Sequence, residues 1–298
     1  MATRIPTTLA CLLLATAAQA EDLTIPTAIG DVTVASGPET IAVLDAAAID
    51  TISALGVTVD AVPAMPPLSY LSDVFETAQP AGSLFEPDFE ALAVLGPDLI
   101  IAGGRSSTQV EPLSEIAPTI DMTIWGEDMI AQAQDRIAAY GTIFKQEAMA
   151  AELSAALDAR LADAVAAAEG QGEALILLTN GGNVSAYGDD SRFGWLHSAL
   201  NLPEAYPDLT AETHGEAVSF EFIAEVNPDW ILVIDRAAAI GQDGEAAAAT
   251  LDNPLVASTT AAQEGQIIYL SSAPLYLAGG GVQSMMLTMD EIIAGFAD

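Results

Sequence analysis

Residues 142–169, TIFKQEAMAAELSAALDARLADAVAAAE, contain no glycine or proline and are rich in alanine, leucine and glutamate. This composition has high helix propensity throughout, so the stretch predicts one long α-helix. On either side of it, short apolar runs alternate with segments of helical spacing, which is typical of parallel β-sheets covered by helices. We therefore expect an α/β fold: two Rossmann-like lobes with parallel sheets, residues 21–141 and 170–298, joined by one connecting helix at 142–169, with a ligand cleft between the lobes.

The expected elements follow from this alternation. Apolar runs predict buried strands at 40–44, 98–102, 173–179, 230–235 and 266–270. Helical spacing predicts helices at 45–55, 88–95, 194–200, 219–226 and 280–296. Gly56 and Gly96-Pro97 stand where the first two of these helices are expected to end.

An internal repeat supports the two-lobe prediction. Phe89-Glu90 is followed by Ala93, Pro97-Asp98, Ile100 and Arg105, and Phe220-Glu221 is followed at the same offsets by Ala224, Pro228-Asp229, Ile231 and Arg236. Chance similarity between two amphipathic units accounts for the apolar matches, but poorly for two arginines in a chain with so few basic residues. Because ligands of open α/β sheets bind beyond the carboxyl ends of the strands, we expect Arg105 and Arg236 to face each other across the cleft.

The chain is strongly acidic, with 7 Lys+Arg against 42 Asp+Glu and a formal net charge of −35. Nucleic acid and anionic membrane surfaces are excluded as partners, because both need clustered basic side chains. A content of 51% hydrophobic and only 16% charged residues also excludes a disordered acidic polymer. The few basic residues are therefore conspicuous, and their positions are informative.

Residues 1–20 have the pattern of an export signal peptide. Arg4 precedes an apolar run at 9–15, and Ala18-Gln19-Ala20 provides a cleavage site of the A-x-A type. The apolar run is well under the ~18 residues of a transmembrane helix, so we expect no membrane span in the mature protein. Cys11, the single cysteine, lies inside this segment, which leaves the mature chain without a disulfide or a cysteine-ligated metal. We expect cleavage after about Ala20 and a mature protein free in the periplasm.

Three basic residues stand at turns or strand ends. Arg192 lies in YGDDSRFGW, residues 187–195, a turn that leads into a helix, and helix starts favour anions. Together with Arg105 and Arg236 it predicts an anion site, because the planar guanidinium suits flat, delocalised anions. The alternative for each arginine is a salt bridge to a local carboxylate. The remaining basic residues lie in helical stretches, where pairing on the surface is expected: Arg136, Lys145 and Arg160.

Aromatic and histidine side chains near these motifs are candidates for the same site. A cationic–aromatic pocket would be completed by Tyr187, Phe193, Trp195 and Tyr276, although each alone is typical of core packing. His214 precedes a helix and is placed to face the cleft. His197 lies within a helix, where a packed histidine is the more common role.

Motifs of known enzyme classes are missing. The chain has no H-E-x-x-H, G-x-S-x-G, phosphate-loop or dinucleotide fingerprint. Gly279-Gly280-Gly281 opens the last helix but lacks the Lys-Ser/Thr of a phosphate loop. Two histidines without cysteine are poor material for a zinc or manganese cage. We expect no enzyme and no intrinsic cofactor; an exported hydrolase is disfavoured because no nucleophile–base pair is visible.

The chain resembles a known family along nearly all of its length after the leader. The most specific stretches are 82–90, 97–105, 185–188, 191–194, 213–223, 233–236, 250–253 and 276–281. They resemble the periplasmic substrate-binding proteins of ABC importers for ferric siderophores, in the branch whose lobes are bridged by one rigid helix. The similarity is greatest to members that bind catecholate siderophores.

The resemblance implies roles for individual residues. The arginine triad that holds the anionic ferric complex falls on Arg105, Arg192 and Arg236. A carboxylate on each lobe docks onto the membrane permease in related members, and by position these are Glu90 and Glu221. Their alternative role is that of a helix N-terminal acid favoured by the macrodipole.

One departure from the family's pattern concerns Phe85. Similar sequences often carry lysine at this position, and losing a cation is expected to lower affinity for the most highly charged complexes or to shift the preference among siderophores. His214 and Tyr276, from their donor atoms, are candidate ligands for an Fe³⁺ that its siderophore leaves incompletely coordinated.

The function we expect is that of a monomeric periplasmic solute-binding protein. It would capture an anionic ferric siderophore, most simply of the catecholate type, and deliver it to the permease of an ABC importer. A ferric tris-catecholate is a trianion, which three arginines would match. Haem and cobalamin remain alternative ligands for the same architecture.

Overall fold

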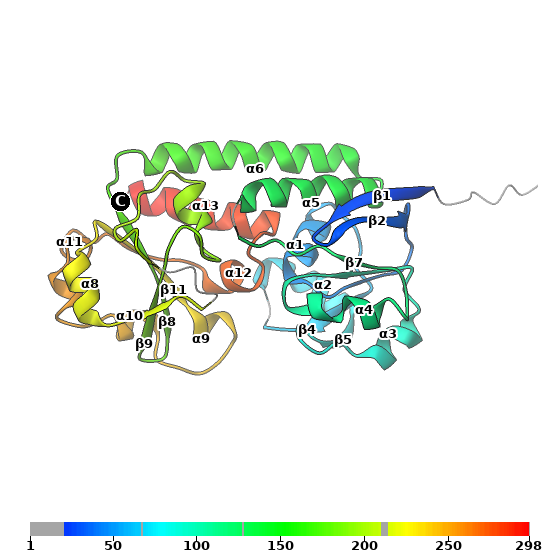
Figure 1. The fold of residues 1–298 in the computed structure, drawn as a ribbon, viewed down its shortest axis with the longest axis horizontal. Coiled ribbons are helices and arrows are strands. Elements are labelled where there is room, and N and C mark those ends of the chain that lie inside the picture. The colour runs from blue at the N-terminus through cyan, green and yellow to red at the C-terminus, as the bar shows by residue number, and fades with distance from the viewer. Residues whose placement is uncertain (1–20, 67, 127, 210–213, 298) are drawn as a thin grey trace, which may run out of the picture.

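The computed structural model describes residues 21–66, 68–126, 128–209 and 214–297, so the expected signal peptide lies outside the described residues. Two five-stranded sheets form two lobes, and a layer of long helices lies along one side of both (Figure 1). The expected α/β fold with two lobes is confirmed. Within the described ranges, no helix combines the length and the apolarity needed to cross a bilayer.

The first lobe is built on a parallel sheet with the strand order β5-β4-β3-β6-β7. Its strands are β3 (Ile41–Val43), β4 (Ala61–Ala64), β5 (Gln79–Ser83), β6 (Leu99–Ala102) and β7 (Thr119–Asp121). Around them lie α1 (Ala46–Ala54), α2 (Ser72–Thr77), α3 (Phe89–Leu95), α4 (Val110–Leu113) and the 3₁₀ turns η1 (Ser69–Leu71) and η2 (Gly104–Gln109). An antiparallel hairpin, β1 (Asp22–Thr27) with β2 (Gly30–Ala35), precedes the lobe and was not expected.

The second lobe has a mixed sheet with the strand order β10-β9-β8-β11-β12. Its strands are β8 (Ala174–Asn180), β9 (Asn183–Tyr187), β10 (Glu216–Val218), β11 (Trp230–Asp235) and β12 (Ile267–Tyr269). Strands β8, β11 and β12 are parallel as expected, whereas β9 runs antiparallel to both of its neighbours, β8 and β10. Only Gly181 and Gly182 separate β8 from β9, and a connection this short forces a hairpin.

Short helices surround this second sheet. They are α7 (Trp195–Ser198), α8 (Phe220–Val226), α9 (Arg236–Ala239), α10 (Ala247–Thr250), η3 (Val256–Ser258), α11 (Thr260–Gln263) and α12 (Ser272–Leu277). The side chains of β8 and β11 are buried along almost their whole length. Such continuous apolar strands fit a sheet that is covered on both faces.

The helical layer consists of α5 (Met129–Ile143), α6 (Glu147–Ala168) and α13 (Val282–Ala297) (Figure 1). The helix predicted over 142–169 is observed from Glu147 to Ala168, because the backbone turns at Lys145, whose φ is 56°. The last helix, α13, packs on α6 and on α1 of the first lobe. The lobes are therefore connected by more than one helix.

The Pro-Asp repeat has a structural explanation. Asp98 accepts hydrogen bonds from the backbone N–H groups of Glu39 and Thr40, each at 2.9 Å, just before β3. Asp229 accepts one from the N–H of Glu173 at 3.0 Å, just before β8. Each aspartate thus ties the start of one strand to the start of its parallel neighbour, so that the following strand ends are held in register.

The three basic residues expected on helix surfaces have different surroundings. Only Arg160 pairs there, with Asp290 at 3.0 Å between α6 and α13. Arg136 is buried, at 8% exposed, and its guanidinium donates to the carbonyls of Pro26, Met122 and Thr123 at 3.2–3.3 Å. The prediction that Arg136 pairs on the surface is wrong, because its side chain turns inward from α5 and binds backbone carbonyls of β1 and of the segment after β7.

Candidate ligand-binding site

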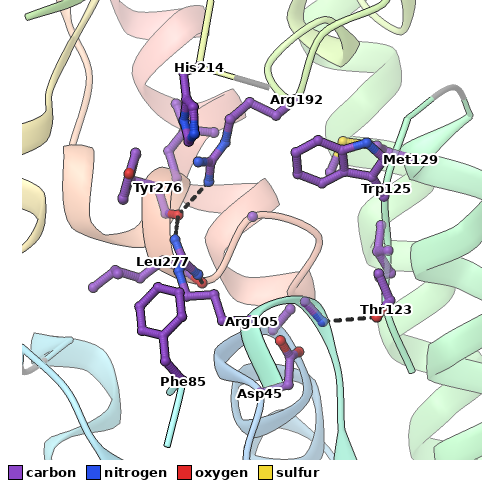
Figure 2. A pocket seen from close by; sticks show the side chains of 15 residues that line it. Asp45, Phe85, Arg105, Thr123, Trp125, Met129, Arg192, His214, Tyr276 and Leu277 are labelled. Carbon is purple, nitrogen blue, oxygen red and sulfur yellow. Dashed lines mark hydrogen bonds between the residues drawn. The ribbon is translucent and has the colours of Figure 1, made fainter. Parts of the chain in front are cut away.

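A cavity of about 380 Å³ lies between the two lobes (Figure 2). The first lobe lines it with Asp45, Ala47, Phe85, Gly104, Arg105, Thr123, Ile124 and Trp125, α5 adds Met129, and the second lobe contributes Arg192, His214, Leu275, Tyr276, Leu277 and Gly279. Arg105 lies in η2, immediately after β6, and Arg192 lies in the turn between β9 and α7. Arg105 thus stands beyond the carboxyl end of a parallel strand, as expected for this fold class, whereas Arg192 follows the antiparallel strand β9.

Tyr276, at the end of α12, is the point on which all three candidate arginines converge. Its carbonyl oxygen accepts hydrogen bonds from Arg192 Nη2 at 2.8 Å and from Arg105 Nη2 at 3.0 Å (Figure 2). Its hydroxyl accepts one from Arg236 Nε at 3.2 Å. Arg105 Nη1 also donates to the carbonyl of Leu277 at 3.3 Å. The last carbonyls of a helix carry partial negative charge, so they hold guanidinium groups without neutralising them.

The arginines also lie over aromatic rings. The Cζ atom of Arg192 is 4.4 Å from the ring centroid of Tyr276 and 4.8 Å from that of Phe193. The Cζ atom of Arg105 is 5.5 Å from the Tyr276 centroid. These cation–π contacts stabilise the guanidinium groups without neutralising their charge.

Within the described residues, no carboxylate lies within ion-pair distance of any of these arginines. Among the described residues, the ion pairs within 4.0 Å involve only Arg160. Arg236 donates instead to the amide oxygen of Asn180 at 3.2 Å. Asp45 lines the cavity near Arg105, but its carboxylate caps α1 by accepting from the N–H of Ala48 at 2.9 Å. Salt bridging, the alternative role considered for the three arginines, is thus not what the structure shows.

The charges of this cluster perturb its titratable groups. Burial acts to raise the pKa of the Tyr276 phenol, but the hydrogen bond from Arg236 and the positive charges of Arg192, Arg236 and Arg105 outweigh it and lower that pKa. Burial lowers the pKa of Arg192, with the neighbouring charge of Arg105 acting in the same direction. The shift of Tyr276 reflects the positive charge gathered at the cavity, whereas that of Arg192 reflects chiefly the burial of its guanidinium. An anion in the cavity would favour the charged form of the arginines.

Three of the four aromatic residues predicted for the pocket do not line it, and one of them, Phe193, is buried beneath Arg192. Tyr187 is buried, and its ring packs edge-on against Phe193 at 4.8 Å between centroids, so it supports the ring beneath Arg192. Trp195 is also buried and borders a separate crevice between α5, α6 and α7. Arg236 is not among the residues that line the cavity; it contacts the lining residue Tyr276 through its hydrogen bond to the phenol. His214 lines the cavity directly.

Several cavity residues were not identified from the sequence. Trp125 is 50% exposed in the cavity wall, with Thr123 beside it after β7. Asp45 follows β3, and Phe85, which the sequence had marked only as a departure from the family's pattern, follows β5 and is 63% exposed. All four stand just beyond the carboxyl end of a parallel strand, and applying the strand-end rule to every strand would have identified Asp45, Thr123 and Trp125.

The two glutamates considered for docking lie away from the cavity. Glu90 is in the first turn of α3 and Glu221 in the first turn of α8, one in each lobe (Figure 1). Both side chains are exposed to solvent. In the part of the chain that the structure describes, no group of three or more His, Cys, Asp or Glu side chains is placed to hold a metal ion.

Comparison with known families gives the class of protein. A model described as periplasmic binding protein matches residues 41–274, well over half of the chain. The chain belongs to the periplasmic binding protein family. Its members bind solutes and are not enzymes, so the hydrolase alternative is dropped.

Individual relatives of this binding protein share most of its length. The petrobactin-binding protein YclQ of Bacillus subtilis is 35% identical over 267 residues, which cover 88% of this chain and 84% of the relative. The ferric-anguibactin-binding protein FatB of Vibrio anguillarum is 29% identical over 280 residues, which cover 90% and 85%.

Solved structures agree with this assignment. The crystal structure of YclQ superimposes with a TM-score of 0.89 at 33% identity, covering 93% of this chain and 99% of that one. The periplasmic catecholate-siderophore-binding protein VctP of Vibrio cholerae gives a TM-score of 0.87 at 30% identity, with coverages of 92% and 100%. The likeness extends over both lobes and the helical layer.

Proposed function

We propose that this protein captures an anionic ferric siderophore in the cavity between its lobes and delivers it to an ABC importer. The observation that carries the proposal is the convergence of Arg105, Arg192 and Arg236 on Tyr276, with no carboxylate paired to any of them within the described residues. The named relatives, which bind petrobactin, ferric anguibactin and catecholate siderophores, support the same class of ligand.

Electrostatics explain why the arginines are grouped. A chain with a formal charge of −35 repels anions, and salt limits the reach of each surface charge to roughly 8 Å. An anion site must therefore reverse the field locally. A charge pair at 4 Å contributes about 1 kcal/mol in water and about 4 kcal/mol in a partly desolvated cleft, so three guanidinium groups are enough to do so.

Catecholate coordination is the finer part of the proposal. Catecholate oxygens carry delocalised negative charge at the edge of flat rings, which suits both the fork and the stacking face of arginine. The rings of Phe85 and Trp125, exposed in the cavity wall, offer flat apolar surfaces to such a ligand. Phe85 stands where similar sequences often carry lysine, so we expect the affinity for the most highly charged complexes to be lower than in relatives that keep the lysine, or the preference among siderophores to shift.

Two cavity side chains are proposed to complete the coordination of the transported iron when the siderophore leaves positions open. His214 offers an imidazole nitrogen, and Tyr276 offers a phenol whose pKa the three arginines lower despite its burial. A lowered pKa makes the phenolate, a strong ligand for Fe³⁺, more accessible. The iron in this proposal is cargo, held chiefly by its siderophore.

The remaining roles are proposed together. The mature protein is a periplasmic monomer, produced by cleavage after about Ala20. Glu90 and Glu221, exposed on separate lobes, dock onto basic pockets of the permease. Changing both to lysine should abolish siderophore uptake by cells while leaving the dissociation constant of the isolated protein unchanged. Loss of binding in that double variant would refute the docking role.

A binding panel tests the proposed function. Tryptophan fluorescence is recorded while ferric tris-catecholate, ferric tris-hydroxamate, ferric citrate, haem or cobalamin is added to the protein and to Arg236→Ala. We expect the tightest binding for the catecholate, and a large loss in the variant for that ligand but not for the uncharged hydroxamate complex. Tighter binding of haem or cobalamin, or equal losses for charged and uncharged ligands, would overturn the proposal.

A further inference from the structure

The chain leaves the second lobe at Gly279-Gly280-Gly281, the glycine run that the sequence left without a role. This run connects α12, which carries Tyr276, to α13 of the helical layer. The start of α13 lies against α1 of the first lobe. Asp50, near the middle of α1, is fully buried at this crossing, with 0% of its surface exposed.

The buried carboxylate of Asp50 binds the start of α13. Its Oδ1 accepts a hydrogen bond from the N–H of Gln283 at 2.8 Å, and its Oδ2 accepts from the N–H of Ser284 at 2.9 Å. The Tyr70 hydroxyl also donates to Oδ2, at 2.7 Å. The amide of residue 282 donates to Thr51 Oγ1 at 3.2 Å. The first amides of α13, which a helix leaves without partners of its own, are thus capped by side chains 231 to 234 residues earlier in the chain.

The glycines permit this close approach of the two lobes. A Cβ atom at Gly281 would lie 2.5 Å from Cγ of Asp50, which no side chain tolerates. Gly280 has a φ of +96°, and a Cβ there would lie 3.1 Å from Ile124, the neighbour of Trp125 in the cavity wall. Glycine is therefore required at both positions, by steric contact at one and by backbone conformation at the other.

A short run of backbone hydrogen bonds links the contact between Asp50 and α13 to the carbonyls that bind the arginines. The N–H of Gly281 donates to the carbonyl of Ala278 at 2.8 Å, and the N–H of Ala278 donates to the carbonyl of Pro274 at 2.9 Å. The carbonyls of Tyr276 and Leu277, which bind the arginines, lie inside this hydrogen-bonded segment. Any displacement of the start of α13 is therefore transmitted to those carbonyls.

We propose that Asp50 is a positioning residue of the ligand-binding site: by fixing the start of α13 against α1, it places the carbonyl oxygens that direct Arg105 and Arg192 into the cavity. The effect on ligand binding rests on the proposed function. The effect on the arginine cluster itself does not, because that cluster is present without a ligand. The test therefore includes one measurement with a ligand and one without.

The variant is Asp50→Asn, which keeps the size of the side chain but turns an NH₂ group toward amide donors. The matched control is Thr259→Ala, which removes a buried cap in the second lobe: Thr259 Oγ1 accepts from the N–H of Ala262 at 3.3 Å and donates to the carbonyl of Val256 at 2.7 Å. Both variants should lower the thermal midpoint. Only Asp50→Asn should also weaken binding of ferric tris-catecholate, by about tenfold, against less than about twofold in the control.

The measurement without ligand is the ionisation of the Tyr276 phenol, followed by ultraviolet absorbance as the difference between each protein and its Tyr276→Phe counterpart. In Asp50→Asn the titration midpoint should move up toward the ordinary tyrosine value, because the guanidinium groups are no longer held around the ring. In Thr259→Ala it should stay where it is in the parent protein.

The outcomes separate the two proposals. If the parent protein binds ferric tris-catecholate but Asp50→Asn behaves like the control in both measurements, the positioning role is refuted and the proposed function stands. If the parent binds no ferric siderophore and the Tyr276 titration still moves in Asp50→Asn, the positioning role stands and the function is refuted. Should Asp50→Asn fail to fold, Tyr70→Phe removes one donor from the same carboxylate, and the same two effects are expected at smaller size; their absence would refute the positioning role.

Discussion

Replacing Arg192 with methionine tests the charge of the cavity with little other disturbance. The methionine stem keeps contact with the rings of Phe193 and Tyr276, over which the guanidinium lies at 4.8 and 4.4 Å. The Tyr276 carbonyl keeps its hydrogen bond from Arg105 at 3.0 Å, so no buried acceptor is left without a donor. What is lost is one of three positive charges in the binding site.

The size of the loss follows from that geometry. A hydrogen bond from a charged group contributes about 1.5–3 kcal/mol net, after desolvation has been subtracted from the Coulomb energy. We expect a loss of about 2 kcal/mol, or roughly 30-fold in the dissociation constant for ferric tris-catecholate. The uncharged ferric tris-hydroxamate should lose less than about threefold, since it has no net charge to pair.

The matched control is Arg160→Met. It removes the same charge from the same chain, but away from the cavity, where Arg160 of α6 pairs with Asp290 of α13 at 3.0 Å. Fluorescence titrations at two ionic strengths measure both variants against the parent. Arg192→Met should show the 30-fold loss and a weaker salt dependence, while Arg160→Met binds like the parent. Equal losses in the two variants would refute the reasoning, because net charge alone would then explain the effect.

Three further predictions concern fluorescence, pH and stability. Trp125→Phe should remove most of the fluorescence quenching that a ferric ligand causes, because Trp125 lines the cavity. Trp230→Phe should keep that quenching, because Trp230 is buried in the core. Quenching that survives in Trp125→Phe would contradict this prediction. Burial raises the pKa of Asp50 to about 7, against the opposing hydrogen bond of Tyr70, so the native state binds more protons than the unfolded one between about pH 4 and 7. The free energy of unfolding should therefore rise as the pH falls through that window, by up to about 1.4 kcal/mol per pH unit, relative to Asp50→Asn in urea titrations; parallel curves for the two proteins would refute the buried charge. Arg136→Met should cost about 2 kcal/mol of stability in urea, because it removes the donor of three backbone carbonyls, among them that of the buried Met122, and a cost below about 0.5 kcal/mol would show that water replaces it.

The overall fold was predictable from the sequence because its signals are local. Strands at 98–102 and 230–235 and the helices before them are marked by apolar periodicity, and the observed elements lie within a residue or two of those limits. The helix at 142–169 was placed correctly but began too early. Composition cannot show the turn at Lys145, which depends on how α6 returns along α5.

The direction of the strands in the second lobe was harder to predict. Alternation of strand and helix indicates a parallel sheet, and it holds for β8, β11 and β12. The hairpin between β8 and β9 is marked only by Gly181-Gly182, within a run that also contains polar residues. This short glycine turn is the only sequence signal for an antiparallel strand here, and it is weaker than the apolar periodicity that predicts a parallel sheet.

The candidate site was predictable at its arginines because cations are rare in this chain. Scarcity marked Arg105, Arg192 and Arg236, and strand-end positions placed two of them at one cleft. Scarcity does not mark aromatic residues: Tyr187 and Trp195 are near Arg192 in sequence but are buried behind it, whereas Trp125 reaches the cavity from another strand end. The role of Asp50 depends on a contact made over more than two hundred residues, and no local pattern reports it.

The most direct test of the central claim is a crystal structure of the protein with ferric tris-catecholate, in which the anomalous signal of iron locates the metal. The account predicts one iron peak in the cavity between the lobes, with catecholate oxygens within hydrogen-bond distance of Arg105 and Arg192. An iron peak outside this cavity, or a ligand bound in it without contact to either arginine, would contradict the account.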